Sequence, residues 1–199
     1  MPMRMGIYGG SFDPVHYGHL LLAECAREQL ELAKVLFVPA ATAPHKQGQE
    51  ATPAKARMEM LELAIGGHSA FEVSALEIER GGLSYTVDTL EALTGHYPDA
   101  ELVLLVGADT LADLPNWKDP KKVVALARIG VVERIGIAIQ AAALPDAELL
   151  RVTMPLVDLS SREIRARTAR GESIRYRTPR GVEQYIAAAG LYRADVCEA

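Results

Sequence analysis

The sequence predicts a single α/β domain built on a doubly wound, Rossmann-like parallel sheet. Short apolar runs alternate with segments of helical periodicity along the whole chain, and the first two apolar runs enclose one helix. No repeat and no linker divides the 199 residues. Such alternation favours parallel strands with right-handed crossovers, and this length suits one domain with a substantial core.

The chain opens with a β-α-β unit. Met3–Tyr8 is apolar and is followed by Gly9-Gly10, so we expect a buried first strand that ends in a glycine turn. Apolar residues at helical spacing predict a helix over 20–30. The apolar run 35–38, closed by Pro39, predicts the second strand.

A polar loop over 40–52 precedes the next helix. Thr52 as a cap, with proline at the first helical position, predicts a helix over 53–65 that stops at two glycines. Alternation over 71–79 predicts a third strand. After a glycine turn, a helix is expected over about 86–93.

The second half continues the alternation. Five apolar residues over 102–106 give the clearest buried strand, whereas the alanine-rich stretch 136–147 permits no assignment. The remaining strands are expected at 129–132 and 149–152, and the remaining helices at 120–127, from Ser160 or Ser161 onward, and at 179–189. We expect one domain over 1–199, in which a helical C-terminal part, from about 155 to 199, completes the ligand site.

Composition narrows the function classes. The net charge of −5 argues mildly against nucleic-acid binding, which usually needs a basic face. No stretch approaches the length of a membrane span, and Met1–Gly6 lacks the apolar run of a signal peptide. Cys25 and Cys197 lie in no metal-binding pattern, which predicts a reducing, cytoplasmic location.

The segment from Gly9 to His19 is the first candidate site. In open α/β sheets, ligands bind beyond the carboxyl ends of the strands, where this segment falls. Its glycines let backbone N–H groups approach a ligand, and the helix that follows points its positive end there. His16 and His19 share one helical face, with Gly18 between them, and imidazole N–H groups can donate to phosphate oxygens. A purely structural histidine pair is the alternative.

The run Gly-Gly-Ser-Phe-Asp-Pro-Val-His-Tyr-Gly-His-Leu over 9–20 resembles the signature of bacterial nicotinate mononucleotide adenylyltransferases, within the HxGH nucleotidyltransferase superfamily. The resemblance implies a nucleotidyltransferase-type fold. It also implies transfer of AMP from ATP to nicotinate mononucleotide, giving nicotinate adenine dinucleotide and pyrophosphate, a step in NAD biosynthesis. By this resemblance His16 and His19 are catalytic, and ATP is bound by Gly9, Gly10, Ser11, Phe12 and Gly18.

Leu159–Arg165 resembles the second family signature, ISSTxIR, with Arg162 in place of the usual threonine. Ser160 and Ser161 open a helix, where hydroxyls and free N–H groups suit ATP phosphates. Arg165, about one turn further, has the planar guanidinium that suits phosphate oxygens, and we expect it to be catalytic. A serine cap on a basic surface helix is the alternative.

Three further stretches resemble family motifs on the acceptor side: Pro44-His45-Lys46, Tyr85–Thr89 and Gly107–Trp117. The resemblance implies that His45 and Lys46 lie close to the acceptor mononucleotide, and that Tyr85 and Thr86 recognise the pyridine carboxylate. Trp117 is expected to stack on the pyridine ring, while Gly107 and Asp109 contact the nucleotide. The C-terminal pattern that ends in Gly190-Leu191-Tyr192 also resembles the family.

The implied reaction needs alignment and charge neutralisation more than a general base, since a phosphate monoester is already largely ionised at neutral pH. Mg²⁺ is expected as cofactor, held mainly by ATP phosphates, with no protein metal site. Alternatives are nicotinamide mononucleotide or phosphopantetheine as acceptor and, in another class, a non-catalytic nucleotide-binding regulator. The predicted partners are ATP and nicotinate mononucleotide, without nucleic acid or membrane. A homo-oligomer is left open.

Overall fold

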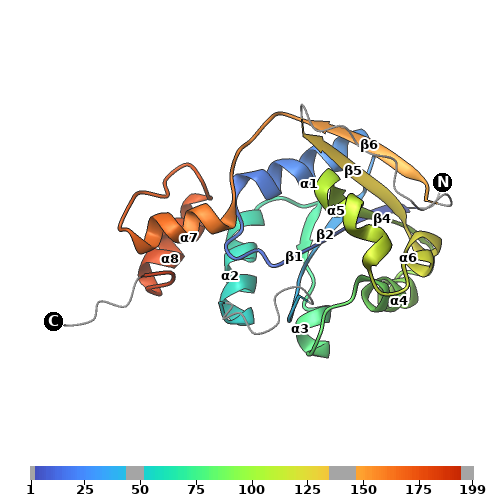
Figure 1. The fold of residues 1–199 in the computed structure, drawn as a ribbon, viewed down its shortest axis with the longest axis horizontal. Helices are drawn as coiled ribbons and strands as arrows, with labels where there is room; N and C mark the ends of the chain where they lie inside the picture. The colour runs from blue at the N-terminus through green and yellow to red at the C-terminus, as the bar shows by residue number, and fades with distance from the viewer. Residues whose placement is uncertain (1–2, 44–51, 135–146, 194–199) are drawn as a thin grey trace.

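The computed structural model describes residues 3–43, 52–134 and 147–193 (Figure 1). Strands and helices alternate along it, with one short 3₁₀ helix (η2). In chain order the elements are β1 (Met3–Gly10), α1 (Tyr17–Gln29), β2 (Lys34–Pro39), α2 (Ala54–Ile65), β3 (Phe71–Val73), α3 (Leu76–Arg80), α4 (Thr86–His96), β4 (Ala100–Gly107), α5 (Ala108–Asp113), η2 (Leu114–Asn116), α6 (Pro120–Leu126), β5 (Arg128–Arg134), β6 (Leu149–Met154), α7 (Ser161–Ala169) and α8 (Arg180–Ala188).

The strands form one six-stranded sheet in the order β3-β2-β1-β4-β5-β6, and every neighbouring pair is parallel. The predicted doubly wound α/β fold is confirmed. The strand order reverses between β1 and β4, so the loops that follow these two strands open at the switch point where such sheets bind ligands.

Both faces of the central strands β1, β2 and β4 are buried, which explains why these strands are apolar runs rather than alternating patterns. Along β4, Val103 and Leu105 join the core under α1 and α2, while Leu102, Leu104 and Val106 join the core under α4 and α6. The first of these cores also contains Ile164, Val182 and Ile186 of the two C-terminal helices.

Helices α7 and α8 extend the molecule beyond the end of the sheet, beside α2 (Figure 1). Tyr185 of α8 donates a hydrogen bond from its hydroxyl to Oε2 of Glu59 in α2. None of the described helices has the length and apolar character needed to cross a membrane. Cys25 is a free, half-buried thiol in α1, and Cys197 lies outside the described residues.

Three predictions of local structure were wrong. The strand expected over 71–79 ends at Val73, and the chain turns into α3, where Glu77 is buried and its carboxylate accepts from the Thr89 hydroxyl. Gly9 and Gly10 do not break β1, because they continue its ladder opposite Val38 and Pro39. Thr52 does not cap α2, because Pro53 is the N-cap residue.

Candidate active site

The two histidines lie at the start of α1, at the switch point. His16 is the N-cap residue and is buried, and its backbone N–H donates to Nδ1 of His19 over 3.2 Å. The two rings stack, with centroids 3.7 Å apart and planes 26° from parallel. Because Nδ1 of His19 accepts this bond, the proton of its neutral ring is on Nε2. This arrangement makes His19 Nε2–H a hydrogen-bond donor.

Gly18 makes room for this stack. A Cβ at Gly18 would lie 3.0 Å from both Cε1 and Nδ1 of the His16 ring. Any larger residue would therefore require the ring of His16 to shift by a few tenths of an ångström. Part of the space that the missing side chain leaves is thus taken by His16 itself.

Aromatic packing around Phe12 anchors the segment that links β1 to α1. The Phe12 backbone is in the left-handed region (φ 48°), and its side chain is only 2% exposed. Its ring packs edge-on against Tyr8 and His19, at centroid distances of 5.4 and 5.1 Å. Phe12 is one of the residues predicted to bind ATP. Because its side chain is buried, only its backbone can contact a ligand. Gly9 differs, because a Cβ there would meet no atom within 4 Å.

The second predicted signature meets the first. Ser160 caps α7 by accepting from the Glu163 backbone N–H, as predicted. The Ser161 hydroxyl donates to the carbonyl oxygen of Pro14 over 2.8 Å, and the Arg165 guanidinium donates to that of Asp13 over 2.7 Å. Residues some 150 positions apart are thus brought to one place.

On the acceptor side, the start of α4 lies against the segment after η2. Lys118 binds the Asp88 carboxylate at 2.9 Å and lies over the Tyr85 ring, 4.7 Å from its centroid. The neighbouring Trp117 is half-buried, and its Nε1–H donates to the Asp113 carboxylate. The predicted acceptor residues Tyr85, Thr86 and Trp117 therefore belong to adjoining segments. Lys118 joins these segments through its contacts with Asp88 and the Tyr85 ring.

Gly107 ends β4 and begins α5 without an intervening loop. A Cβ on Gly107 would lie only 2.6 Å from Oδ1 of Asp109, so the carboxylate of Asp109 folds back over the end of the strand. This places both predicted nucleotide-contacting residues at the carboxyl edge, on the strand that neighbours β1.

Comparison with known proteins agrees with this geometry. A family model described as cytidylyltransferase-like matches residues 7–167. A probable nicotinate-nucleotide adenylyltransferase of Thermomicrobium roseum is 46% identical over 196 residues, covering 96% of this chain and 92% of that protein. One from Thermus thermophilus is 47% identical over 191 residues, covering 96% and 100%. The chain belongs to the nicotinate-nucleotide adenylyltransferase family.

The fold of a solved nicotinic acid mononucleotide adenylyltransferase is also similar. That structure, from Plasmodium falciparum and complexed with NaAD, has a TM-score of 0.81 and 21% identity, covering 96% of this chain and 97% of that one. This likeness shows the fold, while the relatives from Thermomicrobium roseum and Thermus thermophilus confirm the family resemblance predicted from the sequence.

Sequence reasoning missed a group of buried polar residues beneath the adenylyltransferase signature loop. Arg57 of α2 is 3% exposed and donates to the carbonyl oxygens of Ser11 and Thr52. Thr178, 1% exposed, donates from its hydroxyl to the carbonyl oxygen of Val15 over 2.7 Å. The only sequence signal for Thr178 is its position before the proline that caps α8, and Arg57 gives none.

Two of the predicted acceptor residues, His45 and Lys46, lie outside the described residues. The loop that leads toward them is described as far as residue 43. There Thr42 bridges to Leu83, and the Ser84 hydroxyl accepts from the backbone N–H of Ala41. The loop after β2 therefore runs beside the segment that enters α4.

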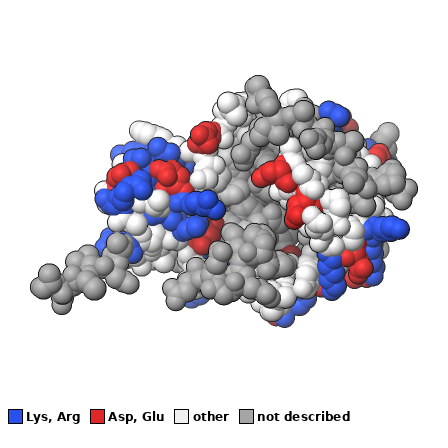
Figure 2. All heavy atoms as spheres, in the orientation of Figure 1, with Lys and Arg blue, Asp and Glu red and all other residues white. Residues whose placement is uncertain are grey.

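Arginines gather around α7 and α8 and form a patch at that end of the molecule (Figure 2). Several are paired with Glu163, Glu172 and Glu183. Arg162, the departure from the family signature, is exposed and makes no ion pair in the part of the chain that the structure describes. Arginines outnumber the acidic residues over 161–193, so this part of the chain carries positive charge although the whole chain has a net charge of −5.

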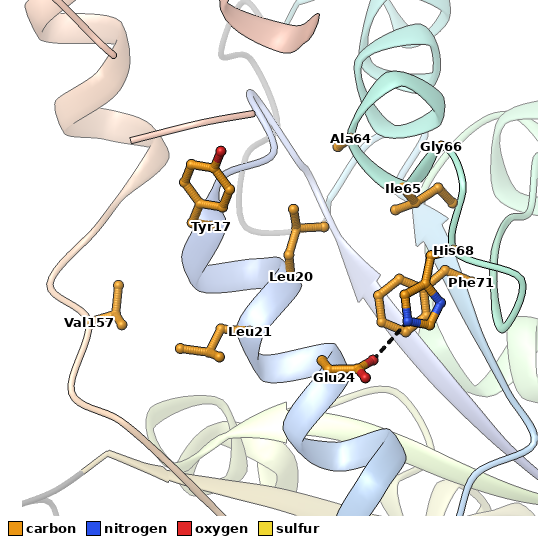
Figure 3. Close-up of a pocket in the computed structure, with 10 residues that line it drawn as sticks. All are labelled: Tyr17, Leu20, Leu21, Glu24, Ala64, Ile65, Gly66, His68, Phe71 and Val157. Carbon is orange, nitrogen blue, oxygen red and sulfur yellow. Dashed lines mark ion pairs between the residues drawn. The ribbon is translucent and has the colours of Figure 1, made fainter. Parts of the chain in front are cut away.

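A separate hollow of about 540 Å³ lies between α1, α2 and the segment before α7 (Figure 3). Its walls are largely apolar, and a His68–Glu24 ion pair (3.1 Å) lies at one side. The hydrogen bond from the Arg27 guanidinium lowers the pKa of the Glu24 carboxyl, with a smaller contribution from His68. None of the predicted site residues in the described part of the chain lines this hollow.

Proposed function

We propose that the protein transfers AMP from ATP to nicotinate mononucleotide, giving nicotinate adenine dinucleotide and pyrophosphate in NAD biosynthesis. One observation carries the proposal: the His16–His19 pair, the start of α7 and the end of β4 converge at the switch point of the sheet. The membership of the chain in the nicotinate-nucleotide adenylyltransferase family supports it.

The reaction joins an oxygen of the acceptor phosphate to the α-phosphorus of ATP and breaks the bond to the β-phosphate bridging oxygen. The second pKa of a phosphate monoester is about 6, so the attacking oxygen is already largely ionised at neutral pH. The protein has to align the two phosphates and neutralise the charge that accumulates on the leaving pyrophosphate.

We assign neutralisation to His16, His19 and Arg165. The Nε2–H of His19 is a donor because Nδ1 is engaged by the backbone of His16. Arg165 keeps one guanidinium nitrogen on the carbonyl of Asp13, and its other N–H groups are the ones proposed to reach ATP. The remaining ATP contacts are proposed for Gly9, Gly10, Ser11, the Phe12 backbone, Gly18, Gly107, Asp109, Ser160 and Ser161.

The acceptor is proposed to bind across the start of α4. The backbone N–H groups at Tyr85 and Thr86 would receive the pyridine carboxylate, and Trp117 would stack on the ring. Lys118 lies over the Tyr85 ring beside this position, where it is paired with the Asp88 carboxylate. His45 and Lys46 stay predicted partners of the acceptor phosphate.

Mg²⁺ is proposed to arrive with ATP. Among the described residues, no three or more His, Cys, Asp or Glu side chains gather to hold a metal ion. Mg²⁺ commonly keeps several waters and binds through substrate phosphates, so these residues fit an ion held mainly by ATP. It would offset phosphate charge.

The helical part from about 155 to 193 is proposed to complete the ATP site. A cytoplasmic location, the absence of nucleic-acid partners and any homo-oligomer stay predictions.

The decisive experiment is pyrophosphate release with ATP and Mg²⁺, comparing nicotinate mononucleotide with nicotinamide mononucleotide and phosphopantetheine. We expect a strong preference for the nicotinate form. Equal use of the two pyridine nucleotides would keep the chemistry and refute the carboxylate site at α4. Nucleotide binding without release on any acceptor would favour a non-catalytic regulator instead.

A further inference from the structure

The carbonyl oxygens of the signature loop are held by side chains from distant parts of the chain. Asp13, Pro14 and Val15 are held by Arg165, Ser161 and Thr178, respectively, at 2.7 to 2.8 Å. The carbonyl of Ser11 is held by Arg57 at 2.9 Å. The backbone N–H of Tyr17 donates to the carbonyl oxygen of Arg177. The path of the loop therefore depends on these contacts as well as on its own glycines.

The side chain of Asp13 provides one further attachment. It is only 8% exposed, and its Oδ1 accepts from the Tyr192 hydroxyl over 2.6 Å. A buried carboxylate needs hydrogen bonds and a nearby cation to offset its lost hydration. Tyr192 supplies the hydrogen bond, and the buried guanidinium of Arg57 supplies the positive charge, since Asp13 and Arg57 interact electrostatically.

The Tyr192 hydroxyl is a permanent donor. Burial raises its pKa well above the ordinary value, and the hydrogen bond to Asp13 raises it further. Burial lowers the pKa of Arg57, while the charge on Asp13 opposes that effect and the guanidinium keeps its proton. Tyr192 and Arg57 therefore both keep their protons across the working range of the enzyme.

A short path links this group to the histidines. Only Pro14 and Val15 separate Asp13 from His16, and both carbonyls are held. The backbone N–H of His16 in turn orients the ring of His19 through Nδ1. Because the backbone between Asp13 and His16 is held at both carbonyls, a shift of Asp13 is expected to move His16 as well. The hydrogen bond from His16 would then move the ring of His19.

We propose that Tyr192 is a positioning residue for adenylyl transfer, acting through Asp13 on the His16–His19 pair. It contacts neither substrate in this role. The inference takes its reaction from the proposed function, while its geometry is independent of which acceptor is used.

The test compares Tyr192→Phe with Tyr185→Phe. Tyr185 is the matched control, because its hydroxyl also donates to a carboxylate, that of Glu59 in α2, which is not part of the loop. We expect Tyr192→Phe to lower kcat about tenfold, with KM for both substrates within about twofold of wild type. Tyr185→Phe should keep kcat within about twofold.

Two outcomes of this comparison overturn the proposal. One is a kcat of Tyr192→Phe close to wild type. The other is an equal loss in Tyr185→Phe, because the tyrosines would then act only as tethers. A double-mutant cycle with Asp13→Asn adds a second criterion. If Tyr192 acts through Asp13, the combined variant is less impaired than the product of the two single effects, whereas independent effects would refute that route.

A spectroscopic measurement separates this inference from the proposed function. Imidazole NMR signals of His16 and His19 should shift in Tyr192→Phe and stay in place in Tyr185→Phe, with His96 as an internal reference. Unchanged His16 and His19 signals would refute positioning whatever the reaction. If the wild-type protein releases no pyrophosphate but the signals shift, the proposed function fails and the positioning stands.

Discussion

Replacing Thr178 with valine removes a single hydroxyl group that donates a hydrogen bond to the signature loop. The variant therefore tests how much this bond contributes to stability. Thr178 and Val15 are both buried, and the Thr178 hydroxyl donates to the Val15 carbonyl over 2.7 Å. Valine has nearly the same shape, so no cavity forms, and the carbonyl loses this donor in a place that water does not reach. Such a loss costs about 1–3 kcal/mol. We therefore expect the free energy of unfolding to fall by about 2 kcal/mol.

For a domain of this length, each kcal/mol shifts Tm by roughly 2–4 °C, so a decrease of about 4–8 °C is expected. Urea titration measures the same effect as a lower midpoint with an unchanged slope. Thr168→Val is the matched control, because the Thr168 hydroxyl donates to the Ile164 carbonyl within its own helix. A change below about 0.5 kcal/mol in Thr178→Val, or one equal to that of the control, would refute the reasoning.

Three further predictions concern the site and its surroundings. His19→Ala should lower kcat on the order of 10²–10³-fold with an unchanged circular dichroism spectrum, since it removes a donor to the transition state; turnover near wild type would contradict its role. Trp117→Ala should raise the acceptor KM by at least about fivefold with little effect on kcat, because stacking on an aromatic ring is worth roughly 1–3 kcal/mol; an unchanged acceptor KM would disprove stacking. Glu24→Gln should reduce stability at neutral pH by less than about 1 kcal/mol. Arg27 lowers the pKa of Glu24, so this stabilisation is complete above the ordinary value of about 4.3 and is lost as the pH falls through the lower folded value. Urea midpoints of wild type and variant should therefore converge in acid, below that ordinary value, and a constant gap would contradict the assignment.

The sequence predicted the fold well because the apolar runs correspond to strands buried on both faces. It also located the two signatures, since glycines, serines and histidines at a strand end or helix start have direct structural meaning. The failure at 71–79 has a local cause. Leu76 and Ile78 alternate with polar residues as in a strand, but Glu77 is buried and bonded to Thr89, which lies in a different helix.

The hydrogen bonds that distant side chains donate to the signature loop could not be predicted in the same way. Most of their acceptors are backbone carbonyls, which leave no trace in residue identity; the exception is the Asp13 carboxylate, which accepts from Tyr192. Three of their donors are single polar residues with no periodicity around them, namely Arg57, Thr178 and Tyr192. Only the three-dimensional arrangement shows that Arg165, expected to contact phosphate alone, also supports the Asp13 carbonyl.

The bond between Asp13 and Tyr192 joins residues 179 positions apart. On the ribosome, the strand that carries the signature loop emerges first and its last support emerges near the end of synthesis. A chain that stalls or is cut before Tyr192 has all six strands but lacks the hydroxyl that donates to the Asp13 carboxylate. If Tyr192 positions the histidines as proposed, a nascent or clipped chain carries both histidines but turns over more slowly than the full-length chain.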